Sequence, residues 1–374
     1  MSKTTIQQLG EFGQSVWLDY ISRSLIDTRK LQGMIDQGLR GMTSNPTIFD
    51  KAISTSADYD NRARELKKLD KSTFEIYDDL TVKDIQDAAD IFKSVHQQTN
   101  GVDGFVSLEV NPRFAYKVEE TVAEAKRLYE KVNRPNVMFK VPSTNEGFTA
   151  IEELLSEGIN INITLIFSLQ QYINTAQAYI KGIERFQQKN GDISNIRSVA
   201  SVFVSRIDTA TDELIQKKLK KEGDAAVKSK LESLRGKAAV AHSAIIYKNY
   251  KETFFGEKFK YLKDKGANVQ RLLWGSTSTK NPAYSDIKYV TELIGKHTVN
   301  TIPEKTLSAF LDHGVVKETL TGDTGEPQEV IDDLMSFGID INDVCKRLLE
   351  DGVVAFENSF ASLLNAIEVK VKKL

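Results

Sequence analysis

The stretch Val137-Met138-Phe139-Lys140-Val141-Pro142 is an apolar run interrupted by a single lysine. A near-continuous apolar run of this length is typical of a parallel strand buried on both faces. Seven more short, mainly apolar runs lie on either side of it: Ser15–Tyr20, Gly41–Asn45, Gly104–Val110, Asn160–Ser168, Ser198–Arg206, Arg271–Thr277 and His297–Pro303. The chain therefore offers eight candidate strands.

Longer amphipathic segments separate these runs and are predicted to be helices. Arg113–Lys131 carries apolar residues at three-to-four-residue spacing, Thr144–Ser156 opens with a Ser/Thr cap signal, and Ser168–Phe186 follows its strand in the same way. Strand then helix, repeated along the chain, predicts βα units with right-handed crossovers. Eight such units predict an α/β fold of the (β/α)8 TIM-barrel type, in which chemistry takes place at the carboxyl ends of the strands.

The chain is longer than a bare barrel, which needs about 250 residues; it has 374. We predict helical insertions at about 51–92 and 207–265, the second holding two helices, and a C-terminal helical extension at about 326–374. One apolar stripe marks that tail as a long helix packed onto the body: Ile341, Val344, Leu348, Gly352, Phe356, Phe360, Leu363 and Ile367. Since no Pro/Gly/Ser-rich linker interrupts the chain, we predict a single domain over residues 1–374.

The composition favours a soluble enzyme acting on small molecules. The 50 lysines and arginines nearly balance 52 aspartates and glutamates, and no run of five basic residues occurs, which argues against nucleic acid or an anionic membrane as the main partner. The one cysteine, Cys345, excludes an internal disulfide, and the four histidines share no metal-ligand spacing. We therefore predict no metal and no other cofactor. The N-terminus lacks a signal-peptide pattern and no apolar stretch is long enough to span a membrane, so we expect a cytoplasmic protein.

Lys140 is the most informative polar residue on these apolar runs. Lysine is depleted from central strands, and burial of an unpaired ammonium costs several kcal/mol. Burial favours the neutral amine, which can attack a carbonyl. A salt-bridged structural lysine is the plainer alternative, but Glu109 and Asp19, each on another strand, add acid/base groups to the nucleophile.

Other polar residues on these runs have weaker signals. Asn45 precedes Pro46, and this pair fits a turn before a helix as well as it fits a site residue. Thr164 shares a strand face with Asn162, but ordinary β propensity also explains a threonine in a strand. Arg206, at the end of the sixth run, and Lys280, beyond the seventh, form a fair pocket for a phosphate, although each alone reads as a surface charge.

Together the motifs resemble those of transaldolases over about residues 10–310. The matching pieces are LDY with Asp19, TSNPTIF with Asn45, VSLEV with Glu109, FKVPSTNEG with Lys140, NITLIFS with Asn162 and Thr164, and SVFVSRID with Ser201, Phe203 and Arg206. The resemblance implies a metal-independent class I enzyme of the non-oxidative pentose phosphate pathway. Such an enzyme moves a dihydroxyacetone unit from sedoheptulose 7-phosphate or fructose 6-phosphate to glyceraldehyde 3-phosphate or erythrose 4-phosphate.

The resemblance also implies a role for each matched residue. Lys140 would form an imine with the C2 ketone, and Glu109 would move protons through a water held near Thr164. Asp19 would accept the C4 hydroxyl proton as the C3–C4 bond breaks. The implied substrate ligands are Asn45, Asn162, Ser201 and Phe203 for the sugar, and Arg206 and Lys280 for the phosphate.

The sequence departs from the family pattern near its second phosphate ligand. Many members carry an arginine in a GxSxRN-like run, whereas Gly275–Asn281 (GSTSTKN) has Lys280 at that place. An arginine guanidinium can bind a phosphate through two parallel hydrogen bonds, whereas a lysine ammonium acts as a point charge. Two alternatives stay open. A related fructose-6-phosphate aldolase typically has Gln in place of Glu109 and Tyr in place of Phe203, and a non-catalytic sugar-phosphate-binding barrel is expected to lack Lys140, Glu109 or Asp19. The oligomeric state is not readable from the sequence.

Overall fold

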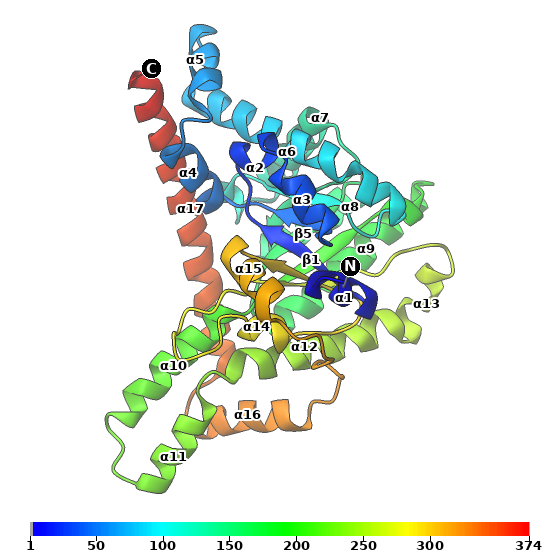
Figure 1. Cartoon of the computed structure of the whole chain (residues 1–374). Coiled ribbons are helices and arrows are strands. Elements are labelled where there is room, and N and C mark those ends of the chain that lie inside the picture. The colour runs from blue at the N-terminus through cyan, green and yellow to red at the C-terminus, as the bar shows by residue number, and fades with distance from the viewer. Residues whose placement is uncertain (1–2, 374) are drawn as a thin grey trace.

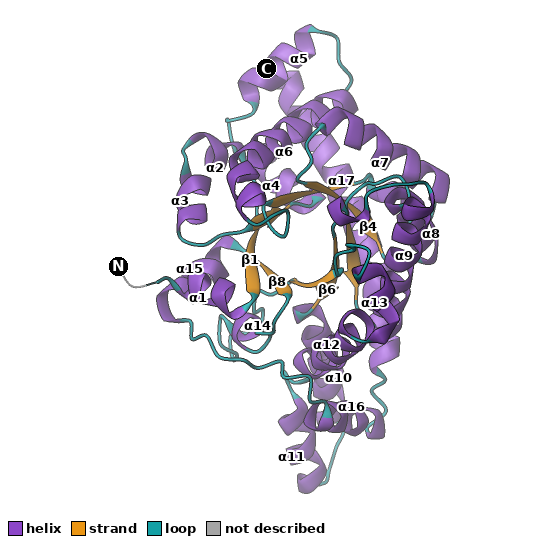
Figure 2. Cartoon of the chain, turned by 90° about the vertical axis from the view of Figure 1, so that its right-hand side faces the viewer, coloured by secondary structure: helices purple, strands orange, loops and turns teal. Residues whose placement is uncertain are grey.

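The computed structural model describes residues 3–373. Eight parallel strands form a closed barrel in chain order, and the last strand pairs with the first (Figure 2). The strands are β1 (Gln14–Asp19), β2 (Gly41–Thr43), β3 (Phe105–Glu109), β4 (Val137–Pro142), β5 (Ile161–Ile166), β6 (Ser198–Phe203), β7 (Arg271–Gly275) and β8 (Thr298–Ile302). The predicted (β/α)8 barrel is confirmed: seven strands lie inside their apolar runs, and β1 begins one residue before its run, at Gln14.

Helices surround the barrel and extend beyond it (Figures 1 and 2). Before β5 they are α1 (Thr5–Phe12), α2 (Arg23–Asp27), α3 (Lys30–Asp36), α4 (Pro46–Thr55), α5 (Asp60–Lys68), α6 (Thr73–Gln98), the short 3-10 helix η1 (Pro112–Phe114), α7 (Val118–Val132) and α8 (Asn145–Leu155). After β5 they are α9 (Leu169–Gln188), η2 (Ile193–Asn195), α10 (Ser205–Leu219), α11 (Ala225–Leu234), α12 (Ala238–Phe255), α13 (Glu257–Lys263), α14 (Lys288–Thr291), α15 (Glu304–His313), α16 (Gly325–Ser336) and α17 (Ile341–Lys373).

The segment 207–265 differs from its prediction. It holds most of α10 and all of α11, α12 and α13, so the prediction of two helices is wrong. Glycines supply the extra breaks: Gly236, in the left-handed conformation at φ +67°, lies between α11 and α12, and Gly256 lies between α12 and α13. The segment 51–92 holds the rest of α4, all of α5 and most of α6.

The inside of the barrel has its own small apolar core. Six buried side chains from six strands form it: Trp17, Phe105, Met138, Val199, Leu273 and Val299. The Trp17 ring needs Gly41 on the neighbouring strand, because a Cβ at Gly41 would lie 2.6 Å from the ring. Near the amino ends of the strands, Asp103 accepts hydrogen bonds from the Trp17 indole (3.1 Å) and from Arg271 (2.9 Å). Charged and apolar side chains thus line this end of the barrel together, around a cavity of about 290 Å³.

Helix α17 crosses the opposite end. It packs against α4 and α10, which follow β2 and β6, and against β5. Thr47 Oγ1 donates a hydrogen bond to Ser359 Oγ at 2.8 Å, and the buried Cys345 thiol donates to the Phe167 carbonyl at 3.3 Å. Figure 1 shows α17 as the red helix along one side of the molecule. The long C-terminal helix is thus confirmed, and it lies over the carboxyl ends of the strands.

Across residues 3–373, none of the helices combines the length and apolarity needed to cross a lipid bilayer.

Candidate active site

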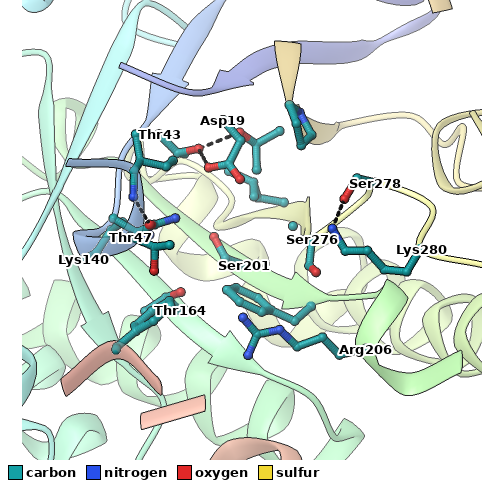
Figure 3. Close-up of a pocket in the computed structure, with 18 residues that line it drawn as sticks. Asp19, Thr43, Thr47, Lys140, Thr164, Ser201, Arg206, Ser276, Ser278 and Lys280 are labelled. Carbon is teal, nitrogen blue, oxygen red and sulfur yellow. Dashed lines mark hydrogen bonds between the residues drawn. The ribbon is translucent and has the colours of Figure 1, made fainter. Parts of the chain in front are cut away.

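A pocket of about 220 Å³ opens at the carboxyl end of the barrel (Figure 3). It lies directly above the interior core, because alternate residues of a strand point the same way. Two residues beyond the core side chains Trp17, Met138 and Val199 come Asp19, Lys140 and Ser201. Eight of the ten predicted site residues line the pocket: Asp19, Asn45, Lys140, Thr164, Ser201, Phe203, Arg206 and Lys280.

Lys140 is buried in the pocket wall. Its side chain is 6% exposed, and its Nζ donates hydrogen bonds to the Ser44 carbonyl at 2.9 Å and to Glu109 Oε2 at 3.3 Å. Glu109 and Lys140 are partners in the β3–β4 register, which places their side chains beside each other. The Phe356 ring of α17 lies 6.0 Å from Nζ and shields the amine from solvent.

Of the two carboxyl groups near Lys140, Glu109 is buried and Asp19 is half-buried in the pocket wall. Burial raises the pKa of the Glu109 carboxyl, and the charge of Lys140 offsets part of that rise. Burial likewise raises the pKa of Asp19, against the opposing charge of Lys140 and a hydrogen bond of 2.8 Å from Thr43 Oγ1. A carboxyl group whose pKa moves toward neutrality can both accept and donate a proton at the working pH. The arrangement thus joins an amine to two acid/base groups.

Strand β5 brings one hydroxyl group to the pocket without a partner. Thr164 Oγ1 is buried and has no hydrogen-bond partner among residues 3–373. Beside it, Leu165 adopts φ +58° where the β5–β6 register shifts, so the strand bulges at the site. A substrate hydroxyl or a water could bond to Thr164 Oγ1.

Two predicted residues lie behind the pocket lining. Glu109 contacts the site only through Lys140, as described above. Asn162 is fully buried, with its Oδ1 accepting from Ser201 Oγ at 2.6 Å and its Nδ2 donating to Ser107 Oγ at 3.0 Å. Both ends of that amide have protein partners, so Asn162 orients Ser201, which itself faces the pocket.

Asn45 caps a helix as well as lining the pocket. Its Oδ1 accepts a hydrogen bond of 2.9 Å from the backbone of Ile48 at the start of α4, with Pro46 as the first helical residue. The structure therefore has the turn before a helix that is one of the two interpretations of Asn45 and Pro46.

Arg206 and Lys280 lie on the side of the pocket away from Lys140 (Figure 3). The prediction that Arg206 ends a strand is wrong: β6 ends at Phe203, and Arg206 lies in the first turn of α10. The apolar alternation of the sixth run continues into the buried face of that helix, which hides the boundary. Its guanidinium stacks over the Phe203 ring at 5.4 Å, and burial lowers its pKa.

Neither cation is bound to a carboxylate. In the described part of the chain no Asp or Glu lies within 4.0 Å of the charged nitrogens of Arg206 or Lys280. Lys280 is exposed and donates to Ser278 Oγ at 2.5 Å. Two cations with free donors, one of them half-buried, suit a phosphate group.

Several pocket residues escape sequence reasoning. Thr43 and Thr301, whose hydroxyls lie 2.6 Å apart, support Asp19 yet look like ordinary strand threonines. Phe356 belongs to an apolar stripe that gives no sign of facing the site. Ser44 contributes only its carbonyl oxygen, which no side-chain pattern can reveal. Strand alternation through Thr43 and Thr301 is the one signal that points to any of them.

The chain matches a family model described as Transaldolase/Fructose-6-phosphate aldolase over residues 16–367. It is 48% identical to a transaldolase of Trichodesmium erythraeum over 98% of this chain and 97% of the relative. A transaldolase of Mycobacterium ulcerans is 43% identical over 100% of this chain and 98% of the relative, and one of Neisseria gonorrhoeae is 40% identical over 96% and 99%. The chain therefore belongs to the transaldolase/fructose-6-phosphate aldolase family and is an enzyme of the transaldolase type.

Proposed function

We propose that this enzyme transfers a dihydroxyacetone unit between sugar phosphates through an imine on Lys140. Sedoheptulose 7-phosphate or fructose 6-phosphate would be the donor, and glyceraldehyde 3-phosphate or erythrose 4-phosphate the acceptor, as in the non-oxidative pentose phosphate pathway. One observation carries the proposal: a buried amine beside Glu109 lies at one side of a pocket whose other side holds two cations. A ketose phosphate has its carbonyl and its phosphate at opposite ends in the same way.

Imine formation requires proton transfers at Lys140. The neutral amine attacks C2 of the ketose, and the resulting carbinolamine loses its hydroxyl group as water. Glu109 Oε2, 3.3 Å from Nζ, is close enough to take a proton from the amine and to return one to the departing hydroxyl. Its raised pKa supports this exchange.

Cleavage requires a second base. Asp19 takes the proton of the C4 hydroxyl, the C3–C4 bond breaks, and its electron pair moves into the imine to form an enamine. The aldose phosphate then leaves, and the enamine adds to the carbonyl carbon of the second aldose phosphate by the reverse steps. Thr43, which donates to Asp19 Oδ1, keeps that carboxylate aimed at the pocket.

The nearest alternative is an aldolase that releases free dihydroxyacetone. Release requires water to protonate the enamine, and the wall at Phe203 is apolar: its ring packs edge-on against Phe167 at 5.5 Å and under Arg206. A phenylalanine offers no hydroxyl group to hold such a water. Turnover of fructose 6-phosphate with and without erythrose 4-phosphate separates the two activities. A transferase depends on the acceptor.

Borohydride trapping tests the covalent step. Reduction in the presence of fructose 6-phosphate should add a substrate-derived mass to the peptide that contains Lys140, and Lys140→Arg should abolish the adduct. An adduct on another lysine, or none in an active enzyme, would overturn the mechanism. Because the imine itself is the electron sink, activity should also survive EDTA; loss restored by a divalent ion would point to a metal-dependent aldolase instead.

We also propose a cytoplasmic location. The sequence has one cysteine, Cys345, whose thiol is buried, and such a protein needs no oxidising compartment.

A further inference from the structure

Two buried aspartates on α10 have no part in the proposed chemistry. Asp208 is 1% exposed and Asp212 is 9% exposed, and they lie one turn apart on the helix whose first turn carries Arg206. No lysine or arginine in the described part of the chain forms an ion pair with either of them. Buried carboxylates are retained at a cost unless other donors satisfy them.

The donors come in two matching pairs. Asp208 accepts from the Ala239 backbone N–H at 2.7 Å and from the Tyr289 hydroxyl at 2.8 Å. Asp212 accepts from the Gly236 backbone N–H at 2.9 Å and from the Tyr284 hydroxyl at 2.6 Å. Asp208 thus joins the start of α12 to α14, and Asp212 joins the turn before α12 to the segment that connects β7 to α14.

That segment carries Lys280. Residues 276–287 connect β7 to α14, and Lys280 lies in their exposed part. Thr277 anchors the segment on one side of Lys280, through a hydrogen bond of 2.9 Å from its Oγ1 to the Thr301 carbonyl. Tyr284 is the corresponding anchor on the other side.

The turn at Gly236 is shaped to receive Tyr284. Gly236 has φ +67°, and a Cβ there would lie 2.7 Å from the tyrosine ring. Only glycine lets the ring lie on the backbone at this position. A cavity of about 310 Å³ lies beside the ring and is bordered by Lys280, Asp208 and Asp212. The Lys280 segment has room to move into this space if the hydroxyl bond is lost.

We propose that Tyr284, held by Asp212, is a positioning residue that keeps Lys280 across the pocket from Arg206, so that both cations bind one phosphate. The inference rests on the proposed phosphate site. It also gives a role to the 207–265 segment, which supplies the Gly236 N–H that binds Asp212 and the backbone on which the Tyr284 ring packs. Tyr284 itself does not line the active-site pocket, so it acts only through Lys280.

Substitution of Tyr284 by phenylalanine tests the proposal, because it removes the hydroxyl and keeps the ring. We expect Tyr284→Phe to raise KM for fructose 6-phosphate about tenfold, the equivalent of one hydrogen bond, with kcat and the slow reaction of unphosphorylated fructose unchanged. In a Lys280→Ala background the same substitution should add nothing. Tyr250→Phe is the matched control, because it removes a buried hydroxyl bond of 2.9 Å to the His297 carbonyl, far from the pocket.

A merely structural role would give a different result. Equal losses on both sugars, or the same tenfold effect of Tyr284→Phe with Lys280 already removed, would overturn the proposal. Calorimetric titration with inorganic phosphate provides a readout that needs no turnover. Weaker phosphate binding by Tyr284→Phe in an enzyme that forms no imine would refute the proposed reaction and leave the positioning role intact. Equal phosphate binding by wild type and Tyr284→Phe would overturn the positioning role alone.

Discussion

Asp19 lines the pocket from β1, whereas Glu109 on β3 lies behind the lining against Lys140, so the two carboxyl groups can act on different atoms. Glu109 contacts the Lys140 amine, whereas Asp19 is held by Thr43 and faces the pocket. We expect Glu109→Gln to slow imine formation and Asp19→Asn to spare it while slowing C3–C4 cleavage, each by about 10²–10⁴-fold. Rates of borohydride trapping measure the first step and single-turnover release of the aldose phosphate the second. Trapping by Glu109→Gln at the wild-type rate would contradict the division.

If the two carboxyl groups act as proposed, we expect their raised pKa values to set the pH dependence of the reaction. A group that acts as a base must be ionised, so raising its pKa raises the pH below which activity is lost. The acid limb of kcat/KM should therefore lie above 4.5, the ordinary value for a glutamate, and well above 3.8, that for an aspartate. A pH profile on fructose 6-phosphate measures this limb. A midpoint below 4.5 would contradict a base with the raised pKa of Glu109, and a midpoint below 3.8 would contradict one with the raised pKa of Asp19 as well.

At the scale of single elements, the sequence predicts the strands better than their ends. Buried parallel strands have an apolar signal of their own, so each of the eight coincides with its predicted run, and only β1 begins a residue early, at Gln14. The predicted end of the sixth strand, at Arg206, is wrong because the apolar strand passes directly into a helix with a buried face. Buried positions are apolar in both elements, so the sequence does not mark the boundary between them. Lys140 and Asp19 are predictable because charge on a buried strand is rare. Phe356 and the Ser44 carbonyl are not, because only the packing of α17 and the course of the backbone bring them to the amine.

Helix α17 passes close to the β5 bulge at Gly352. A Cβ there would lie 3.1 Å from Leu165 Cδ2 and 3.7 Å from an Arg206 nitrogen, and Leu165 already occupies the strained conformation beside Thr164. Glycine to alanine within a helix normally stabilises by about 0.5–1 kcal/mol. We expect Gly352→Ala to destabilise instead, by about 1–3 kcal/mol, and to lower kcat/KM as Leu165 shifts.

Gly33→Ala provides the control for this helix prediction. Gly33 lies in α3, and a Cβ there would have no atom within 4 Å, so the substitution should raise the melting temperature slightly. Calorimetric melting of both variants decides the question. A Gly352→Ala variant that is stabilised and fully active would show that α17 is not tightly packed against the β5 bulge at Leu165.

Across the whole molecule, the two ends of the barrel have different tasks. At the amino end Asp103 is held by Ser15 (2.6 Å), by Arg271 and by the Trp17 indole, so the charges of Asp103 and Arg271 are closely paired. At the carboxyl end Lys140 and Glu109 are both 6% exposed, and their separation of 3.3 Å makes a loose ion pair. Loosely paired buried charges stabilise a fold poorly. The reactive end of this barrel is thus expected to lower its stability.

Replacing the Lys140–Glu109 pair by uncharged residues of similar size tests this expectation. A buried ion pair exchanged for such residues is often worth about 1–4 kcal/mol of added stability, so Lys140→Met/Glu109→Gln should melt several degrees higher than wild type while losing activity. Lys140→Met alone should melt below wild type, because it leaves Glu109 buried without its cation. The exposed pair Lys260–Asp264, changed to Met and Asn, is the matched control and should leave the melting temperature unchanged. A double variant that melts below wild type would show that the pair stabilises the barrel, and that the reactive arrangement does not weaken the fold.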